Sequence, residues 1–187
     1  MRLNIEQSVF WITRTAVMTA LLVTVQFLTA MLGNQYVTGS MVNLLLAVSA
    51  LTFGLATGLS VAVMSPVFAF LVGVGPVFPP LVPFIILGNA VYVVAWFVLG
   101  RLSSSMHQGS WRKAFSFINP VAAAAAKFLA LYSGVVLLAL PYILNVNEKQ
   151  IELMSLMFSY PQFVTALIGG SIANAITPTL KKALRNR

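Results

Sequence analysis

The sequence predicts an all-α membrane protein with six transmembrane helices and with both termini in the cytoplasm. Three observations lead to this class. Only 7% of the 187 residues are charged and 59% are hydrophobic, whereas a soluble domain carries about 25% charged residues. The apolar residues gather in runs that approach the roughly 20 residues needed to cross a bilayer as a helix. Lysine and arginine concentrate in alternate connections between these runs, as is typical of cytoplasmic segments.

Each predicted span is bounded by polar or turn-forming residues. The segment GNQYVTGS closes the first span, and the long apolar run after it is divided near Gly54 and Gly58 because it exceeds one crossing. The second span is then short for a full crossing, so a tilted or partly re-entrant helix is an option there. The six predicted spans are Trp11–Leu32, Met41–Phe53, Leu55–Gly73, Leu81–Leu102, Pro120–Leu144 and Pro161–Leu180, with a lead-in helix from Ile151 as an option before the last.

Three connections are predicted to lie outside regular helix. GVGPVFPPLVP contains four prolines in eleven residues, which regular helix does not tolerate. SSSMHQGSWRKAFSFIN is polar and basic, and NVNEKQIEL is polar. No domain boundary or internal repeat is evident, so residues 1–187 are expected to form a single domain.

The distribution of basic residues predicts the orientation in the cell membrane. With a cytoplasmic N-terminus, only Lys149, next to Glu148, lies outside. This bias requires an even number of spans and so supports the count of six. The net charge of +8 is therefore explained by basic residues that orient the chain in the membrane. Nucleic-acid binding is disfavoured, because these charges are divided among short connections. The cytoplasmic basic residues are Arg2, Arg14, Arg101, Arg112, Lys113, Lys181, Lys182, Arg185 and Arg187.

Composition excludes several kinds of chemistry. The chain has no cysteine, so it offers no disulfide and no thiolate metal site. One histidine, His107, and three acidic residues leave little material for a metal centre, and neither a metal nor a cofactor is predicted. No GxxxxGK[ST] motif is present, so no ATP site is expected on this chain. The N-terminal MRLNIEQSVFWITRTA shows no small-residue cleavage site, so the first helix is expected to be retained.

The first span carries two small residues on one face, Ala16 and Ala20. Small residues four apart allow another membrane helix to approach closely. The other helix belongs either to this chain or to another subunit. A similar face in the last span combines Ala166, Gly170 and Asn174.

The chain resembles the substrate-binding S-components of energy-coupling factor (ECF) vitamin transporters. The likeness rests on the Ala-x-x-x-Ala pattern of Ala16 and Ala20 and on the segment LTFGLATGLSVAVMSPVFAFLVGVGPVFPPLVPFIILGNAVYVVAWFVLGR, together with the length and the six spans. It implies a non-enzymatic subunit that binds one vitamin near the extracellular side. It also implies docking through Ala16 and Ala20 onto a transmembrane coupling protein that works with two cytoplasmic ATPases.

Polar residues inside the spans are the candidate ligand contacts, because such groups are costly in lipid and usually face a cavity or the bundle interior. Asn89, Tyr92 and Trp96 share one helix face by their spacing, below the proline-rich connection, which is expected to form a lid. The other candidates in the outer halves of their spans are Gln26, Asn43 and Gln162.

Lys127 is the strongest single signal for a ligand site. An ammonium at a helix centre costs roughly 2.5–3.5 kcal/mol on insertion scales, and no aspartate or glutamate lies within any predicted span. Three interpretations remain open, namely an anionic group of a ligand, a side chain that snorkels to the cytoplasm, and internal carbonyl or amide partners.

A cation surrounded by amides, tyrosines and a tryptophan suits a small monoanion with hydroxyl and amide groups, and pantothenate is the best match. The sequence is also most similar to the pantothenate branch of the S-components. Nicotinate, biotin and lipoate carry one carboxylate as well, whereas pyridoxine and hydroxymethylpyrimidine carry none and would weaken the case for Lys127.

Two other classes of function are less favoured. A stand-alone carrier or channel would be expected to show an intramembrane acid for cation coupling, and the spans contain none. An intramembrane hydrolase would need an activated nucleophile, but Ser133 and Lys127 are six residues apart and lie on different faces of their helix. The chain is therefore not expected to be an enzyme.

Overall fold

A computed structural model describes residues 5–76, 78–105, 110–144 and 146–185, and its description of side chains omits 110–114. The elements are α1 (Ile5–Ala30), α2 (Gln35–Val48), the π-helix η1 (Ser49–Phe53), α3 (Leu55–Leu71), the 3-10 turn η2 (Pro79–Leu81), α4 (Val82–Ser105), α5 (Ser110–Leu131), the π-helix η3 (Tyr132–Ala139), α6 (Leu140–Tyr142), α7 (Glu148–Met157) and α8 (Tyr160–Arg185). Among the residues named above, Arg2, His107 and Arg187 lie outside the described residues, as do the side chains of Arg112 and Lys113.

All regular elements in the described part of the chain are helices, which confirms the all-α part of the prediction. Five helices or continuous helical runs are long and apolar enough to cross a membrane, and Leu55–Leu71 is an apolar helix of 17 residues. At about 1.5 Å per residue, that shorter helix extends about 25 Å. The five long runs are Ile5–Ala30, Gln35–Phe53, Pro79–Ser105, Phe115–Tyr142 and Glu148–Arg185.

The second helix is longer than the sequence predicted. It begins at Gln35 because the Asn34 side chain caps it, accepting hydrogen bonds from the amides of Tyr36 and Val37. With η1 it reaches Phe53 as one run of 19 residues, so the predicted start at Met41 was wrong. The predicted break near Gly54 is confirmed, since Gly54 has φ +88°, which favours glycine.

Two of the predicted loops are also partly helical. Helix α5 starts at Ser110 and carries Pro120 inside it, so the second half of the predicted basic loop belongs to a helix. Helix α7 begins at Glu148, where Asn147 and Gln150 form a reciprocal capping box. A lead-in helix before the last span is thus confirmed, and it begins three residues before Ile151.

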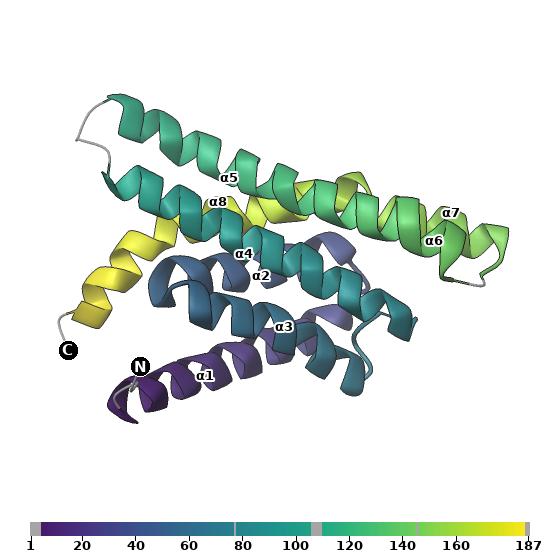
Figure 1. Ribbon diagram of the computed structural model, residues 1–187, viewed down its shortest axis with the longest axis horizontal. Coiled ribbons are helices and arrows are strands. Elements are labelled where there is room, and N and C mark those ends of the chain that lie inside the picture. The colour runs from purple at the N-terminus through teal and green to yellow at the C-terminus, as the bar shows by residue number, and fades with distance from the viewer. Residues whose placement is uncertain (1–4, 77, 106–109, 145, 186–187) are drawn as a thin grey trace.

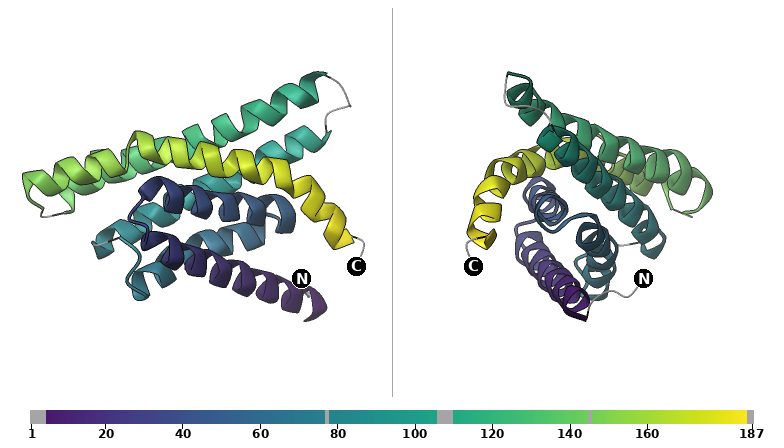
Figure 2. Two further views of the ribbon diagram at one scale, coloured as in Figure 1. Left: turned by 180° about the vertical axis from the view of Figure 1, so that it is seen from behind. Right: turned by 60° about the vertical axis from the view of Figure 1, so that its left-hand side comes forward.

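The helices form a bundle in which the first and last helices have their terminal ends at the same end of the long axis. Figure 1 shows the N- and C-terminal ends at one end of the bundle and the α6–α7 connection at the other, and Figure 2 shows α8 running along the back of the molecule. The main contacts join α2 with α8, α4 with α5, α5 with α8, and α3 with α4 and α1. The sequence neighbours α1 and α2 also touch.

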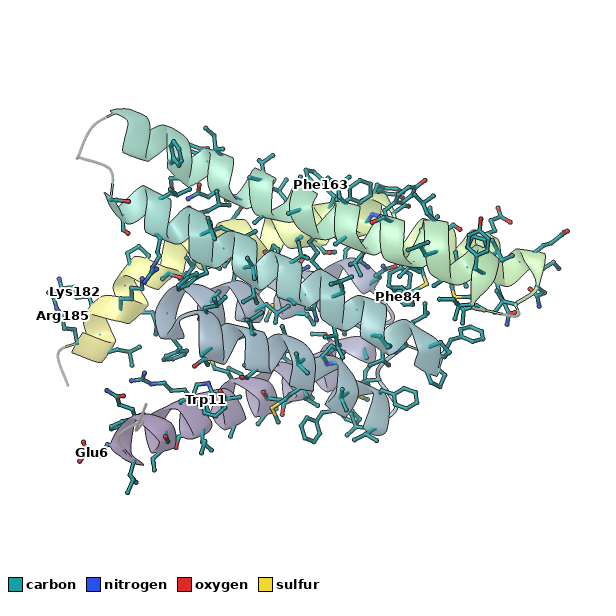
Figure 3. All side chains as sticks on the ribbon, in the orientation of Figure 1. Glu6, Trp11, Phe84, Phe163, Lys182 and Arg185 are labelled. Carbon is teal, nitrogen blue, oxygen red and sulfur yellow. The ribbon has the colours of Figure 1, made fainter. Side chains whose placement is uncertain are left out.

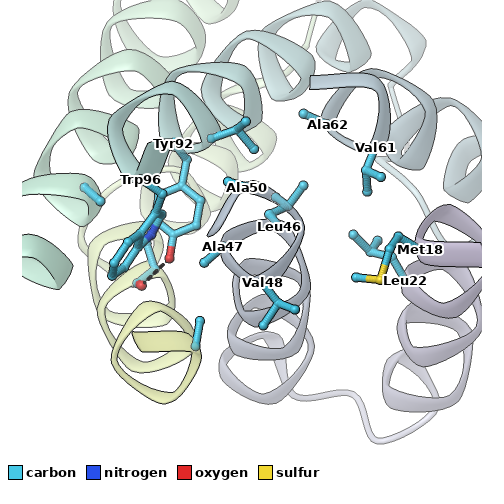
Figure 4. Packing of buried hydrophobic residues seen from close by; sticks show 14 of the residues in the cluster. Met18, Leu22, Leu46, Ala47, Val48, Ala50, Val61, Ala62, Tyr92 and Trp96 are labelled. Carbon is cyan, nitrogen blue, oxygen red and sulfur yellow. Dashed lines mark hydrogen bonds between the residues drawn. The ribbon is translucent and has the colours of Figure 1, made fainter. Parts of the chain in front are cut away.

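Small residues bring α8 against its neighbours. A Cβ added at Gly169 would meet the backbone of Ser40 and Leu44, and one added at Gly170 would meet the rings of Trp96 and Tyr92. These rings belong to the main core cluster, where they stand edge to face beside Leu46 and Ala47 (Figure 4). The small-residue face predicted for the last span therefore packs inside this protein.

Candidate functional site

A polar cavity of about 410 Å³ lies within the bundle. It lies where α1 ends and α2 begins, away from the chain termini, and its wall includes residues of α1 to α5, α7 and α8. The loop Val74–Pro76 forms part of the wall and follows Gly73, which has φ +76°. This volume falls within the range usual for small-molecule sites. Its polar lining residues are Gln26, Asn34, Gln35, Thr38, Asn43, Ser65, Asn89, Lys127 and Gln162.

Lys127 forms the centre of the polar wall. Its ammonium donates to Asn43 Oδ1 at 2.6 Å and to Asn89 Oδ1 at 2.7 Å, and only 3% of the residue is exposed. The snorkelling interpretation is wrong for this structure, because the buried ammonium donates to Asn43 and Asn89 and does not extend along α5 toward its first turn. The side chain turns into the bundle instead, where amide partners from α2 and α4 receive it.

A second hydrogen bond orients the Asn43 amide. Asn43 donates from Nδ2 to Thr165 Oγ1 at 3.3 Å, which turns its carbonyl oxygen toward the ammonium. This chain of contacts joins α8, α2 and α5, while Asn89 adds α4. Lysine has three N–H donors, and the two amides accept two of them. One donor is left for a group in the cavity that Lys127 lines.

Tyr92 and Trp96 do not line the cavity, although they share a helix face with Asn89. Both are fully buried, and the Tyr92 hydroxyl donates to the Ala166 carbonyl at 2.8 Å. Lys127 Nζ lies 5.3 Å from the centroid of the Tyr92 ring, within the range of a cation–π contact. Tyr92 therefore packs against Lys127 on the side away from the cavity, and Trp96 packs against Tyr92.

Gln26 and Gln162 do line the cavity, as their depth predicted. Gln162 donates from Nε2 to the Met157 carbonyl at 3.1 Å. Gln26 Oε1 is buried and has no hydrogen-bond partner among the described residues. A hydrogen-bond donor on a ligand would remove this cost, since an unpaired buried acceptor is unfavourable.

Sequence reasoning missed Ser65. Its hydroxyl is buried on the cavity side of α3 and lacks a partner within the described part of the chain. The adjacent Pro66 lies inside α3 and also lines the cavity. The dipeptide Ser-Pro in an otherwise apolar span was the available signal, because proline removes a helix hydrogen bond and so creates a polar spot.

The small residues of α1 face away from the bundle. The buried face of α1 consists of Thr15, Met18, Thr19 and Leu22, whereas Ala16 and Ala20 are exposed. The interpretation that Ala16 and Ala20 contact other helices of this chain is therefore wrong.

The described residues contain no group of three or more histidine, cysteine or acidic side chains that could hold a metal ion. The hydrogen bonds of the cavity wall come instead from amides, hydroxyls and one ammonium. Such a set has the donors and acceptors that suit a polar organic molecule.

Comparison with known proteins gives one match. Residues 12–181 match a family model described as ECF transporter, substrate-specific component. No curated protein and no solved structure matches significantly.

Proposed function

Because the chain belongs to the family of ECF transporter substrate-specific components, we propose that it captures a small anionic vitamin from outside the cell. It spans the cell membrane six times with both termini in the cytoplasm. The end that carries the termini bears Arg14, Arg101 and Lys181, while Lys149 lies in α7 at the other end. By the distribution of basic residues, the cavity then opens toward the extracellular side.

The observation that carries the proposal is the amide-bound ammonium of Lys127 in the cavity wall. No carboxylate is present among the described lining residues. A carboxylate on the ligand supplies the missing negative charge and accepts the remaining N–H of Lys127 in a charge-assisted hydrogen bond. Gln26, Asn43, Asn89 and Gln162 are the amide contacts proposed for the rest of the ligand.

Pantothenate is the proposed ligand. It combines one carboxylate with two hydroxyls and one amide, which match the Gln26 acceptor, the Ser65 hydroxyl and the asparagine amides that line the cavity. Nicotinate, biotin and lipoate share the carboxylate and are the first alternatives. Pyridoxine or hydroxymethylpyrimidine would bind without using the charge of Lys127.

The partners proposed are an ECF transmembrane coupling protein and two ATPase subunits. The exposed face of Ala16 and Ala20 is the proposed contact with the coupling protein, since small residues permit close helix approach. The bound vitamin is delivered to the cytoplasm through this assembly, and the chain itself performs no chemistry.

A binding screen of the purified chain tests the ligand class. The protein is unfolded thermally with pantothenate, nicotinate, biotin, lipoate, pyridoxine, hydroxymethylpyrimidine or thiamine. We expect stabilisation by carboxylate vitamins and the largest shift with pantothenate, because a ligand that binds only the folded state raises its stability. Stabilisation by neutral or cationic vitamins alone would contradict the proposal of an anion site.

A further inference from the structure

A second polar hollow lies at the opposite end of the bundle from the vitamin cavity. Its volume is about 360 Å³, and its wall combines the π-helix η1 with the ends of α4 and α8. The described lining includes two cations, Arg101 and Lys181, and no carboxylate. The proposed function uses these two side chains only to orient the chain in the membrane, and it does not use the hollow.

Aromatic rings in the wall hold cations at its rim. The Arg101 guanidinium lies 4.8 Å from the centroid of Phe97, and the Arg14 guanidinium lies 5.5 Å from that of Phe53. Phe53 and Phe97 both line the hollow. Stacking on an aromatic face leaves the edge of a guanidinium, with its N–H donors, free to meet an anion.

The three acidic residues of the chain do not neutralise the positive charge at the end of the bundle that holds the hollow. The chain has three acidic residues, and Glu148 and Glu152 both lie in α7 at the far end of the bundle. The third, Glu6, lies in the first turn of α1 and is not among the lining residues of the hollow. Figure 3 shows Lys182 and Arg185 at the same end as Glu6, and neither of these two basic residues lines the hollow.

The floor of the hollow adds polar groups. Thr52 Oγ1 is buried and has no hydrogen-bond partner among the described residues. Helix α3 starts directly after Gly54 without a side-chain cap, whereas η1 and α4 end at the hollow, and their terminal carbonyls favour its two cations. The hydroxyl of Ser104 donates to the Arg101 carbonyl at 2.8 Å and is therefore already used.

From this combination we infer that the hollow is a binding site for a phosphate group, of the kind carried by an anionic phospholipid headgroup. Arg101 and Lys181 pair with the phosphate oxygens, and the guanidinium of Arg101 provides a planar pair of donors. Basic pockets between helices at the cytoplasmic edge of a membrane bind such headgroups. Leu102, which follows Arg101 on α4, is half exposed and offers apolar surface for acyl chains.

Native mass spectrometry of the full-length chain tests this site. The protein in detergent is incubated with phosphatidylglycerol or with phosphatidylcholine, and the retained lipid is quantified. Arg101→Gln with Lys181→Gln is the test variant. Lys182→Gln with Arg185→Gln is the control, because it removes the same charge from exposed residues of α8 that do not line the hollow. Thermal unfolding of both variants verifies that they fold.

We expect selective retention of phosphatidylglycerol over phosphatidylcholine, reduced about tenfold or more by the test variant and less than twofold by the control. Equal losses in the two variants, or equal retention of the two lipids, would overturn the site.

Glycerol phosphate, which lacks acyl chains, separates the sources of phosphate. If it stabilises the wild type but not the test variant, the site takes a soluble phosphate. If it has no effect while phosphatidylglycerol is retained selectively, the source is a lipid. Binding of neither probe would refute the inference.

Discussion

At the scale of single residues, Lys127 belongs to a hydrogen-bond network, although it is the only charged residue in its apolar stretch of sequence. Lys127 would be costly alone in an apolar helix, but Asn43 and Asn89 accept hydrogen bonds from it. The charge remains without a carboxylate partner among the described residues of the cavity wall. This arrangement stabilises the ammonium through protein groups and leaves one of its N–H donors for an anion.

Replacing Asn89 tests how far the network stabilises the fold. In an Asn89→Leu variant the ammonium keeps only one of its two amide acceptors, so we expect the free energy of unfolding to fall by about 1–3 kcal/mol. Chemical or thermal unfolding in detergent measures this change. A Gln162→Leu variant is the control, because its amide donates to the exposed Met157 carbonyl and takes no part in the Lys127 network, and a change within about 0.5 kcal/mol is expected. Equal stability of the Asn89 variant and the wild type would contradict the role of the network.

At the scale of helices, two similar small-residue faces have different roles. The face of α8 is covered by α2 and α4, where Gly169 meets the backbone of Ser40 and Leu44. The face of α1 is uncovered, since Ala16 and Ala20 are exposed. The first therefore stabilises this chain, and the second is available to another subunit.

A pair of leucine substitutions separates the two roles. Gly169→Leu is expected to destabilise the isolated protein by about 1–3 kcal/mol, because its side chain would meet backbone atoms that cannot move aside. Ala20→Leu is expected to leave the stability and the vitamin affinity unchanged but to abolish co-purification with the coupling protein. Unfolding curves and co-purification from a strain that expresses all subunits measure the two effects. Normal assembly of the Ala20 variant would contradict docking through α1.

The sequence predicted the helical elements better than their ends. Apolar runs predicted the six helices because span length follows from bilayer thickness, but α2 and α5 begin earlier than expected. Local capping by Asn34 extended α2, and Pro120 was accommodated within α5. The depth of each polar residue along its span was the basis for the predicted site. Four of the residues chosen in this way line one cavity, namely Gln26, Asn43, Asn89 and Lys127. The burial of Tyr92 and Trp96 could not be predicted, since it depends on Gly170 of α8, and the face that α8 presents to α4 is a tertiary property.

At the scale of the whole molecule, the proposed topology assigns the two ends of the bundle to opposite sides of the membrane. The natural absence of cysteine makes single-cysteine labelling possible without a modified background. Glu152 and Ala183 are exposed positions near opposite ends. A membrane-impermeant maleimide applied to intact cells is expected to label Glu152→Cys and to label Ala183→Cys only after the cells are opened. Labelling of both in intact cells would contradict the cytoplasmic C-terminus.

The central claim is that Lys127 receives the negative charge of the ligand. Isothermal titration of pantothenate and of its uncharged amide, pantothenamide, into wild-type protein, Lys127→Met and the exposed control Lys149→Met tests it most directly. We predict that wild type and control prefer the carboxylate. Lys127→Met should lose about 2 kcal/mol of affinity for it, roughly 30-fold, and bind the amide nearly as before. An unchanged preference for the carboxylate in a folded Lys127→Met variant would contradict the account.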